Sequence, residues 1–338
     1  MRKRNGMFPL EETCDKQNHL LDSFWPQGDL QYLMSGRCGI YHCLLDILQH
    51  DSKRVAYLPL YTCETVVAPY VKAGFKLKFY SFDRNMTPIF EDEALDEISL
   101  INICGYYGFS NYDKAFVKKC HERGIIVMED MTHSVLSKDA LDENCDYAAG
   151  SLRKWMGVAC GGFALKRSGK FNVQAMPPHE QHLKLRYDAI NNDDNDVFWE
   201  GEMLLRQIFD DYASDDQSRY IMDHVDYDVI CQARRENYQT LLDNVKENPA
   251  FQVVFPVLDE NSVPSHFTIL AEDRKKVQAY LKALDIKNAV YWPQGPYIVL
   301  DGQEDTAFIY EHVVSICCDQ RYTREDMLRV AEALNNYR

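Results

Sequence analysis

Short apolar runs alternate with amphipathic segments along the first half of the chain. The segments with the length and composition of buried strands are 54–60, 76–82, 98–104, 124–130 and 161–166. Between them, the spacing of apolar positions predicts helices over 37–50, 62–73 and 111–123. Strands separated by helices of this length are typical of parallel βαβ units. We therefore predict an α/β fold with a mostly parallel sheet covered by helices.

The C-terminal third has a different pattern. One long amphipathic helix is predicted over 226–247, followed by strands at 251–257, 266–271 and 288–293 and helices at 272–285 and 322–336, the last with Thr323 as its N-cap. This is the pattern of a small α+β domain. We expect three units, which are an N-terminal segment (1–25), a large domain (26–225) and a small C-terminal domain (226–338).

One part of the large domain has no clear pattern. Residues 167–225 are more polar than the rest, and the acidic run 191–196 is typical of a solvated loop between helices.

Composition narrows the possible partners. The formal net charge of -15 disfavours a nucleic-acid partner, because phosphate binding needs clustered lysine and arginine. No run approaches the roughly 18 apolar residues of a membrane span, and no apolar stretch follows the basic start as in a signal peptide. The eleven cysteines are scattered without a CxxC pair. This favours a reduced, cytoplasmic protein and offers no metal site.

In an open parallel sheet, ligands bind beyond the carboxyl ends of the strands. The pair Ser35-Gly36 lies at such a position and opens a predicted helix. Free backbone N–H groups at a helix N-terminus suit a phosphate, although a Ser-Gly pair is more often an ordinary cap. This segment is therefore a candidate phosphate site only in combination with others.

Two further segments are candidates for a ligand site. The strand at 124–130 ends on Glu129-Asp130, with His133 three residues later. A buried carboxylate there needs a partner, such as a protonated ring nitrogen, but Asp130 equally suits a helix cap. The second segment places Ser151 three residues before Lys154 and ahead of a Gly-Gly pair. A lysine near a pocket can form a Schiff base, although most lone lysines are surface residues.

The order of these segments is more informative than any one of them. A phosphate turn, an aspartate at a strand end and a Ser-x-x-Lys segment are the protein groups that pyridoxal phosphate requires. They supply a phosphate cradle, a partner for the pyridinium and a lysine.

The chain also resembles the DegT/DnrJ/EryC1/StrS family of pyridoxal 5′-phosphate enzymes, which have fold type I of the aspartate-aminotransferase superfamily. The resemblance covers most of the chain and is weakest at 167–225. It is carried by SGR (35–37), LPLYTCETV (58–66), GFKLKFYSFD (74–83), GYYGF (105–109), MEDMTHS (128–134), SLRKWMGVACGG (151–162) and CDQRYTREDM (318–327).

The resemblance implies a role for each matching position. Lys154 would bind the cofactor as an aldimine, and would be buried for that reason. Asp130 would pair with the pyridine nitrogen, and His133 would approach the ring near its phenolic oxygen. The phosphate would be held by backbone N–H groups of Gly36 and Arg37 and by the hydroxyl of Ser151.

The chain departs from the family pattern in two places. Typical members carry an aromatic ring stacked on the cofactor where this chain has Cys63, so that Tyr61 or Tyr107 is left to stack. The asparagine segment with which sugar aminotransferases complete the neighbouring subunit's site is not recognisable around 180–225. Two further candidates are Trp292, which borders the substrate pocket or belongs to the core, and Arg321, which binds an anion or forms an ion pair within its own domain.

The resemblance implies an aminotransferase that moves an amino group from glutamate to a keto sugar, possibly nucleotide-linked, for amino-sugar or polysaccharide biosynthesis. It also implies a homodimer. Two alternatives keep the cofactor, namely a dehydratase or lyase, and a non-catalytic regulatory protein that binds pyridoxal phosphate. Family dehydratases carry histidine at the lysine position, and Lys154 disfavours that reaction.

Overall fold

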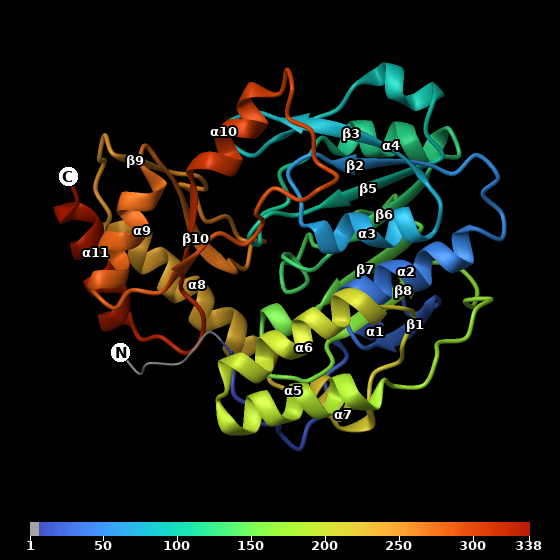
Figure 1. Cartoon of the computed structure of the whole chain (residues 1–338), viewed down its shortest axis with the longest axis horizontal. Helices are drawn as coiled ribbons and strands as arrows, with labels where there is room; N and C mark the ends of the chain where they lie inside the picture. The colour runs from blue at the N-terminus through green and yellow to red at the C-terminus, as the bar shows by residue number, and fades with distance from the viewer. Residues whose placement is uncertain (1–6) are drawn as a thin grey trace.

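A mixed sheet of eight strands forms the centre of the molecule in the computed structural model, which describes residues 7–338 (Figure 1). Strands β7, β6, β5, β2 and β3 run parallel, whereas β1, β8 and β4 join antiparallel at the two ends. The order is β1-β8-β7-β6-β5-β2-β3-β4. The strands are β1 (Asp29–Leu33), β2 (Val55–Pro59), β3 (Lys76–Phe82), β4 (Pro88–Ile89), β5 (Leu100–Cys104), β6 (Ile126–Asp130), β7 (Tyr147–Ser151) and β8 (Gly162–Lys166).

The predicted α/β fold with a mostly parallel sheet is confirmed, and all five predicted strands are present. The apolar pattern did not identify β7. Its sequence, YAAGS, is fully buried but consists largely of small residues that have low β-propensity. Its place in the sheet follows from packing against neighbours on both sides.

Helices cover both faces of this sheet. On β5, Leu100 faces the apolar cluster that includes α2 and α3, whereas Ile101 and Ile103 face the cluster that includes α4. This alternation is the period of two expected of a strand. The helices in this part of the chain are α1 (Leu20–Phe24), α2 (Gly36–Ile47), α3 (Glu64–Lys72), α4 (Lys114–Glu122), α5 (Glu180–Asn192), α6 (Asn195–Ile208) and α7 (Asp216–His224), with 3₁₀ turns η1 (Asp92–Asp96) and η2 (Leu152–Lys154).

The prediction of a loop over the acidic run 191–196 is wrong. Helix α5 continues to Asn192, and α6 begins at Asn195. Asp193 adopts the left-handed conformation (φ 51°) that ends α5. The carboxylate of Asp194 accepts hydrogen bonds from the backbone N–H groups of Asp196 and Val197 and so caps α6. Acidic residues are favoured in such a turn, because short polar side chains tolerate this conformation and satisfy a helix N-terminus.

The C-terminal part contains a four-stranded antiparallel sheet in the order β11-β12-β10-β9. Thr323 caps the last helix as predicted, in a reciprocal capping box with Asp326. The predicted strands at 251–257 and 288–293 are shorter than expected, and one helix and one strand were not predicted. The elements are α8 (Tyr227–Asn244), β9 (Phe251–Val253), β10 (His266–Ala271), α9 (Arg274–Ala283), β11 (Asn288–Ala289), α10 (Glu304–His312), β12 (Val313–Cys317) and α11 (Arg324–Asn336).

Within residues 7–338, none of the helices combines the length and the apolar character needed to cross a membrane.

The first turn of α2 lies directly on the sheet because two glycines permit it. A Cβ atom at Gly162 would lie 2.1 Å from the carbonyl oxygen of Ser35, and one at Gly39 would lie 2.3 Å from the carbonyl oxygen of Phe163. Both distances are far below van der Waals contact, and the colliding atoms are backbone. Glycine at these two positions therefore allows the N-terminus of α2 to pack directly against β8.

We expect Gly162→Ala to lower the free energy of unfolding by more than about 2 kcal/mol, because backbone must move to admit the methyl group. Urea unfolding of the purified variants measures this. The control is Gly201→Ala in α6, where the nearest atom to a new Cβ is 3.5 Å away. This variant is expected to be at least as stable as the wild type, because alanine has a higher helix propensity than glycine. Equal stability of the two variants would contradict the close contact of α2 with β8.

Candidate active site

Asp130 ends the central strand β6. It lies between Cys104 of β5 and Ala149 of β7 in the strand register. The side chain is 7% exposed, and its Oδ1 accepts a hydrogen bond from the backbone N–H of Thr132 at 2.9 Å. Among the described residues, no cation lies within ion-pair distance of it. Burial raises the pKa of Asp130, and the charge of Lys154 acts in the opposite direction. The site thus holds a buried carboxylate without a charged partner in contact.

Ser151 and the first turn of α2 meet beside this strand. Ser151 ends β7, and a Cβ atom at Gly36 would lie 3.1 Å from the Cβ of Ser151. Ser35 caps α2 by accepting a hydrogen bond from the backbone N–H of Cys38. The N-terminus of α2, with its free N–H groups, is therefore next to the Ser151 side chain. This arrangement has the chemistry of a phosphate cradle.

Lys154 ends the 3₁₀ turn η2 that follows β7. Its neighbours Leu152 and Trp155 are fully buried, but Lys154 itself is exposed. The prediction that the bound cofactor buries Lys154 stays a prediction, because the exposure seen here is that of the protein chain alone. Protein atoms nevertheless crowd this side chain, and this desolvation lowers the pKa of the Lys154 amine. A solvent-accessible amine with a lowered pKa is suited to nucleophilic or base chemistry.

Three charged side chains next to Lys154 were not found from the sequence as a group. Glu202 of α6 forms ion pairs with Arg153 and, at 3.1 Å, with Arg186 of α5. Burial acts to raise the pKa of Glu202, but the charges of the two arginines outweigh it and lower that pKa to about 2. Arg186 and Glu202 lie in the polar region 167–225, where no motif marked them. Only the packing of α5 against α6 brings them to Lys154.

Aromatic rings surround His133. This histidine is buried, its ring centroid lies 4.6 Å from that of Trp292 and 5.8 Å from that of Tyr107, and its Nδ1 is 3.4 Å from Oγ of Ser265. Burial and the nearby charges of His266 and Lys154 hold the pKa of His133 well below its ordinary value. His133 is therefore neutral at physiological pH. Trp292 lies at the site and also packs on the core.

The two tyrosines predicted to stack on a cofactor lie within this cluster. The hydroxyl groups of Tyr61 and Tyr107 are 3.4 Å apart, and both side chains are fully buried. Tyr61 stacks on Tyr106 with a centroid distance of 5.6 Å, and Trp292 lies against both Tyr61 and Tyr107. Trp292 is half-buried and so has the accessible ring surface that the two tyrosines lack.

Cys63 lies on the other side of Lys154. It is the N-cap residue of α3 and is half-buried, and Oγ1 of Thr65 donates to its Sγ. Charge on this sulfur would act on both the Arg37 guanidinium and the Lys154 amine, raising the pKa of each. Cys63 therefore lies close to both cations.

Contacts join part of the predicted site: Gly36 lies against Ser151, His133 contacts Tyr107, and the hydroxyl groups of Tyr107 and Tyr61 are close together. The charge of Lys154 acts on Asp130, and that of Cys63 acts on Lys154 and Arg37. Arg321 lies outside this group. Its guanidinium contacts Asp319 at 2.7 Å and 2.8 Å, which confirms the ion-pair interpretation.

The group fits pyridoxal phosphate on its own geometry. The unpaired carboxylate of Asp130, the accessible amine of Lys154 and the tight contact of Gly36 with Ser151 are the three features that this cofactor needs.

Comparison with solved structures gives the same fold. The chain is similar to PseC of Helicobacter pylori, an aminotransferase involved in pseudoaminic acid biosynthesis, with 15% identity, a TM-score of 0.68 and coverage of 97% of this chain and 98% of PseC. DesV of S. venezuelae matches at 14% identity and a TM-score of 0.68, covering 98% and 90%. A DegT DnrJ EryC1 StrS aminotransferase from Brucella abortus matches at 13% and 0.63, covering 94% and 88%.

No family model matches the chain, and no curated protein matches it in sequence. The structural likeness therefore establishes the fold, which the chain shares with PseC, DesV and the Brucella abortus aminotransferase.

Glu129, next to Asp130, points to the other face of β6. Its carboxyl accepts hydrogen bonds from the hydroxyl of Tyr112 and from the backbone N–H of Asp142, and burial raises its pKa to about 8. Between the ordinary pKa of 4.5 and this value, the folded chain holds a proton that the unfolded chain has lost. Stability therefore falls as pH rises through this window, by up to about 1.4 kcal/mol per pH unit.

We expect Glu129→Gln to remove this contribution, so that its free energy of unfolding declines less than that of the wild type as pH rises through the window. Urea unfolding at several pH values measures the slope. Glu143→Gln makes the same charge change at an exposed position nearby and is expected to keep the wild-type slope. A wild-type slope in Glu129→Gln would show that Glu129 is ionised throughout.

Proposed function

We propose that this chain is a pyridoxal-phosphate-dependent aminotransferase that transfers an amino group from glutamate to a keto sugar, possibly a nucleotide-linked one. The observation that carries the proposal is that Asp130 and Ser151 end the paired strands β6 and β7, that Lys154 follows Ser151 in the turn η2, and that the N-terminus of α2 lies against Ser151. The sugar acceptor is supported by the description of PseC as an enzyme of pseudoaminic acid biosynthesis.

Each residue of the site has a definite task in this proposal. The hydroxyl of Ser151 and the backbone N–H groups of Gly36 and Arg37 donate to the cofactor phosphate. Asp130 would accept a hydrogen bond from the protonated pyridine nitrogen and keep it protonated, and burial would make that charge pair strong. His133, which is neutral, would contribute to the cofactor pocket without adding a charge. Pyridoxal phosphate, when bound, supplies an electron sink for the substrate carbon.

Lys154 then serves as the base that moves a proton at the substrate carbon. Its lowered pKa increases the fraction of neutral amine near physiological pH. Glu202 acts in the opposite direction, because its charge raises the pKa of Lys154, while Arg153 lowers it. The balance of these charges sets the pH at which Lys154 is able to accept a proton.

The proposal includes a homodimer in the cytoplasm. The scattered cysteines support a reducing compartment. On α6, Trp199 and Met203 lie four residues apart and are 54% and 51% exposed. Large apolar side chains at this spacing share one helix face, and burial of that face against a second copy would stabilise the pair.

We expect the full chain, loaded with pyridoxal phosphate and then freed of unbound cofactor by gel filtration, to be yellow and to lose that colour on addition of glutamate. Lys154→Ala is expected to stay colourless after the same treatment, because it lacks the amine that would bind the cofactor. An absorbance spectrum before and after glutamate measures both effects. Lys184→Ala, which removes an exposed lysine of α5, serves as the control and is expected to behave like the wild type.

A wild-type chain that stays colourless with the cofactor would reject the proposed cofactor. Colour that forms but resists glutamate would reject glutamate as the donor.

The homodimer is tested by sedimentation. We expect the wild-type chain to sediment at twice its mass of 39.3 kDa, and the double variant Trp199→Glu with Met203→Glu to sediment as a monomer because it would bury two charges. Val229→Glu on α8, at a position that is 61% exposed, is the control. A wild-type monomer would refute the dimer, and a dimeric double variant would refute the role of this α6 face.

A further inference from the structure

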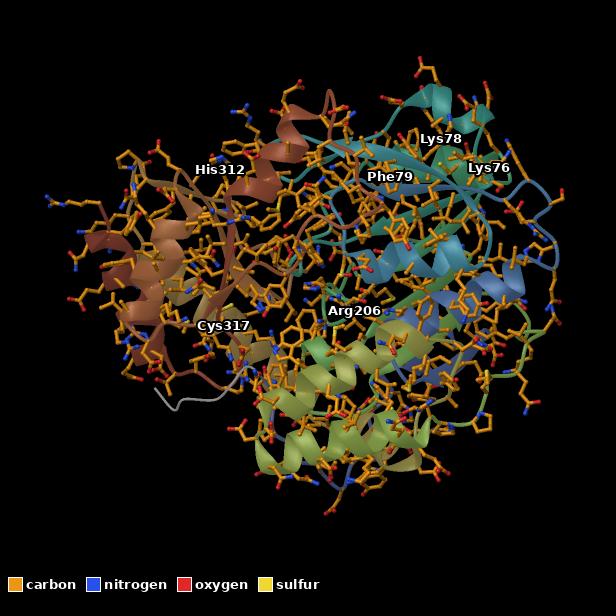
Figure 2. All side chains as sticks on the ribbon, viewed as in Figure 1. Lys76, Lys78, Phe79, Arg206, His312 and Cys317 are labelled. Atoms are coloured by element: carbon orange, nitrogen blue, oxygen red, sulfur yellow. The ribbon has the colours of Figure 1, made fainter. Side chains whose placement is uncertain are left out.

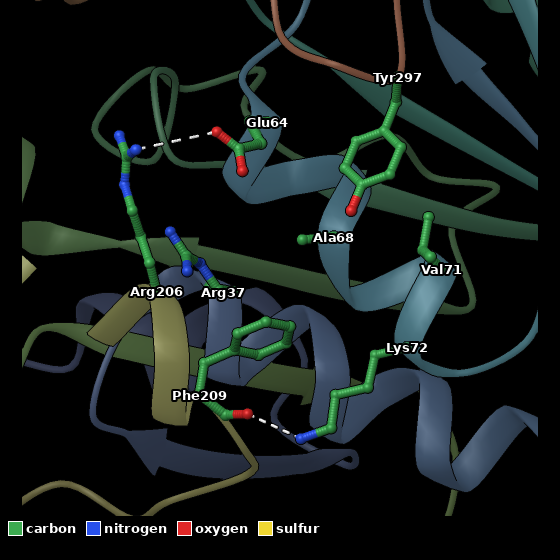
Figure 3. Close-up of a pocket in the computed structure, with 8 residues that line it drawn as sticks. All are labelled: Arg37, Glu64, Ala68, Val71, Lys72, Arg206, Phe209 and Tyr297. Atoms are coloured by element: carbon green, nitrogen blue, oxygen red, sulfur yellow. Dashed lines mark hydrogen bonds and ion pairs between the residues drawn. The ribbon is translucent and has the colours of Figure 1, made fainter. Parts of the chain in front are cut away.

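A cavity of about 280 Å³ lies between α2, α3, the end of α6 and the segment that contains Tyr297 (Figure 3). The residues that line it are Arg37, Glu64, Ala68, Val71, Lys72, Arg206, Phe209 and Tyr297. In Figure 2, Arg206 is near the centre of the molecule, where the C-terminal end of α6 approaches α3. The cavity is thus formed by segments that are far apart in the sequence.

Arg37 is the unusual side chain of this cavity. It is 8% exposed, and its Nε is buried without a hydrogen-bond partner. Nη1 reaches only the carbonyl oxygen of Leu205 at 3.5 Å, and the guanidinium lies 5.1 Å from the ring centroid of Phe209. Within residues 7–338, no carboxylate lies at ion-pair distance from it. A buried guanidinium without a counter-charge is costly, so the presence of Arg37 at this position lowers the stability of the fold.

The other two cations of the lining are already paired. Arg206 lies 3.9 Å from Glu64, and Lys72 donates to Asp210 at 2.8 Å and to the carbonyl oxygen of Phe209 at 2.7 Å. These pairs leave the charge of Arg37 uncompensated. In Figure 3, Ala68 lies between the Arg37 guanidinium and the Tyr297 hydroxyl, and the Phe209 ring lies below them in the view.

The cavity adjoins the proposed active site through Arg37 and Cys63. Arg37 belongs to the first turn of α2, so its backbone lies at the phosphate cradle while its side chain lines the cavity. Cys63 lies near both Lys154 and Arg37, and the next residue, Glu64, lines the cavity. Cys63 is therefore the residue that relates the cavity to the surroundings of Lys154.

We propose that this cavity binds a phosphoryl group of the acceptor substrate and that the Arg37 guanidinium is its principal ligand, with the Tyr297 hydroxyl as a second donor. This inference rests on the proposed function and adds to it, since it assigns a place to a second anion, distinct from the cofactor phosphate. Arginine presents a planar set of donors that matches phosphoryl oxygens. The cavity lining carries three cations and one carboxylate, and the nearby N-terminus of α2 adds positive potential.

Calorimetric titration of the full chain, saturated with pyridoxal phosphate, with inorganic pyrophosphate tests the proposal. We expect wild type to bind, and Arg37→Gln to bind at least about tenfold more weakly because one charge-assisted contact is lost. Arg84→Gln removes an exposed arginine that pairs with Asp305, and is the matched control that should bind as wild type does. Succinate in place of pyrophosphate is expected not to bind.

The absence of pyrophosphate binding by the wild type, or undiminished binding by Arg37→Gln, would overturn the proposal. Binding of succinate in place of pyrophosphate would overturn the phosphoryl assignment.

A second variant keeps the test independent of ligand binding. Without any anion, Arg37→Met is expected to unfold at a higher temperature than the wild type, because it removes a buried uncompensated charge, and a lower unfolding temperature would count against this account of Arg37.

A Ser151→Ala chain separates this inference from the proposed function. This substitution removes a donor of the cofactor cradle and leaves the cavity lining intact. Pyrophosphate binding that needs Arg37 but persists in Ser151→Ala would support the cavity even if the chain fails to form a coloured complex with pyridoxal phosphate. Binding lost in both Ser151→Ala and Arg37→Gln would assign the pyrophosphate to the cofactor cradle and would overturn the separate subsite.

Discussion

The close contact between the first turn of α2 and the ends of β7 and β8 is the constraint on which the site depends. Ser35 approaches Gly162 more closely than any side chain would allow, and Gly36 lies tightly against Ser151. This contact sets the free N–H groups of α2 beside the Ser151 hydroxyl, and it sends the Arg37 side chain away from the sheet. The cradle and the neighbouring cavity are thus two consequences of one backbone contact.

Charge balance around Lys154 is the second organising feature. The amine and two arginines are offset by the single carboxylate of Glu202, which the paired helices α5 and α6 carry to this position. The charge of this amine also acts on Asp130, at the end of β6. Desolvation first, and then the charged neighbours, set the charge state of Lys154. This arrangement suits a group that must alternate between charged and neutral forms.

The C-terminal part of the chain completes the site through aromatic packing. The hydroxyl of Tyr310 donates to the carbonyl oxygen of Leu60, and Trp292 packs against Tyr61 and His133. These contacts join α10 and the segment after β11 to the strand ends of the central sheet. Any movement of the C-terminal part would therefore change the surroundings of His133 directly.

The sequence alone determined the fold class, the five apolar strands and the order of the candidate site residues, because buried strands and helix caps leave local patterns. The position of Asp130 at a strand end followed from the same rule, whereas the strand that Ser151 ends was not predicted. Tertiary packing decided the rest. The small residues of β7, the turn at Asp193-Asp194, the exposure of Lys154 and the meeting of Arg153, Arg186 and Glu202 depend on contacts between residues distant in the chain, and such contacts leave no periodic signal.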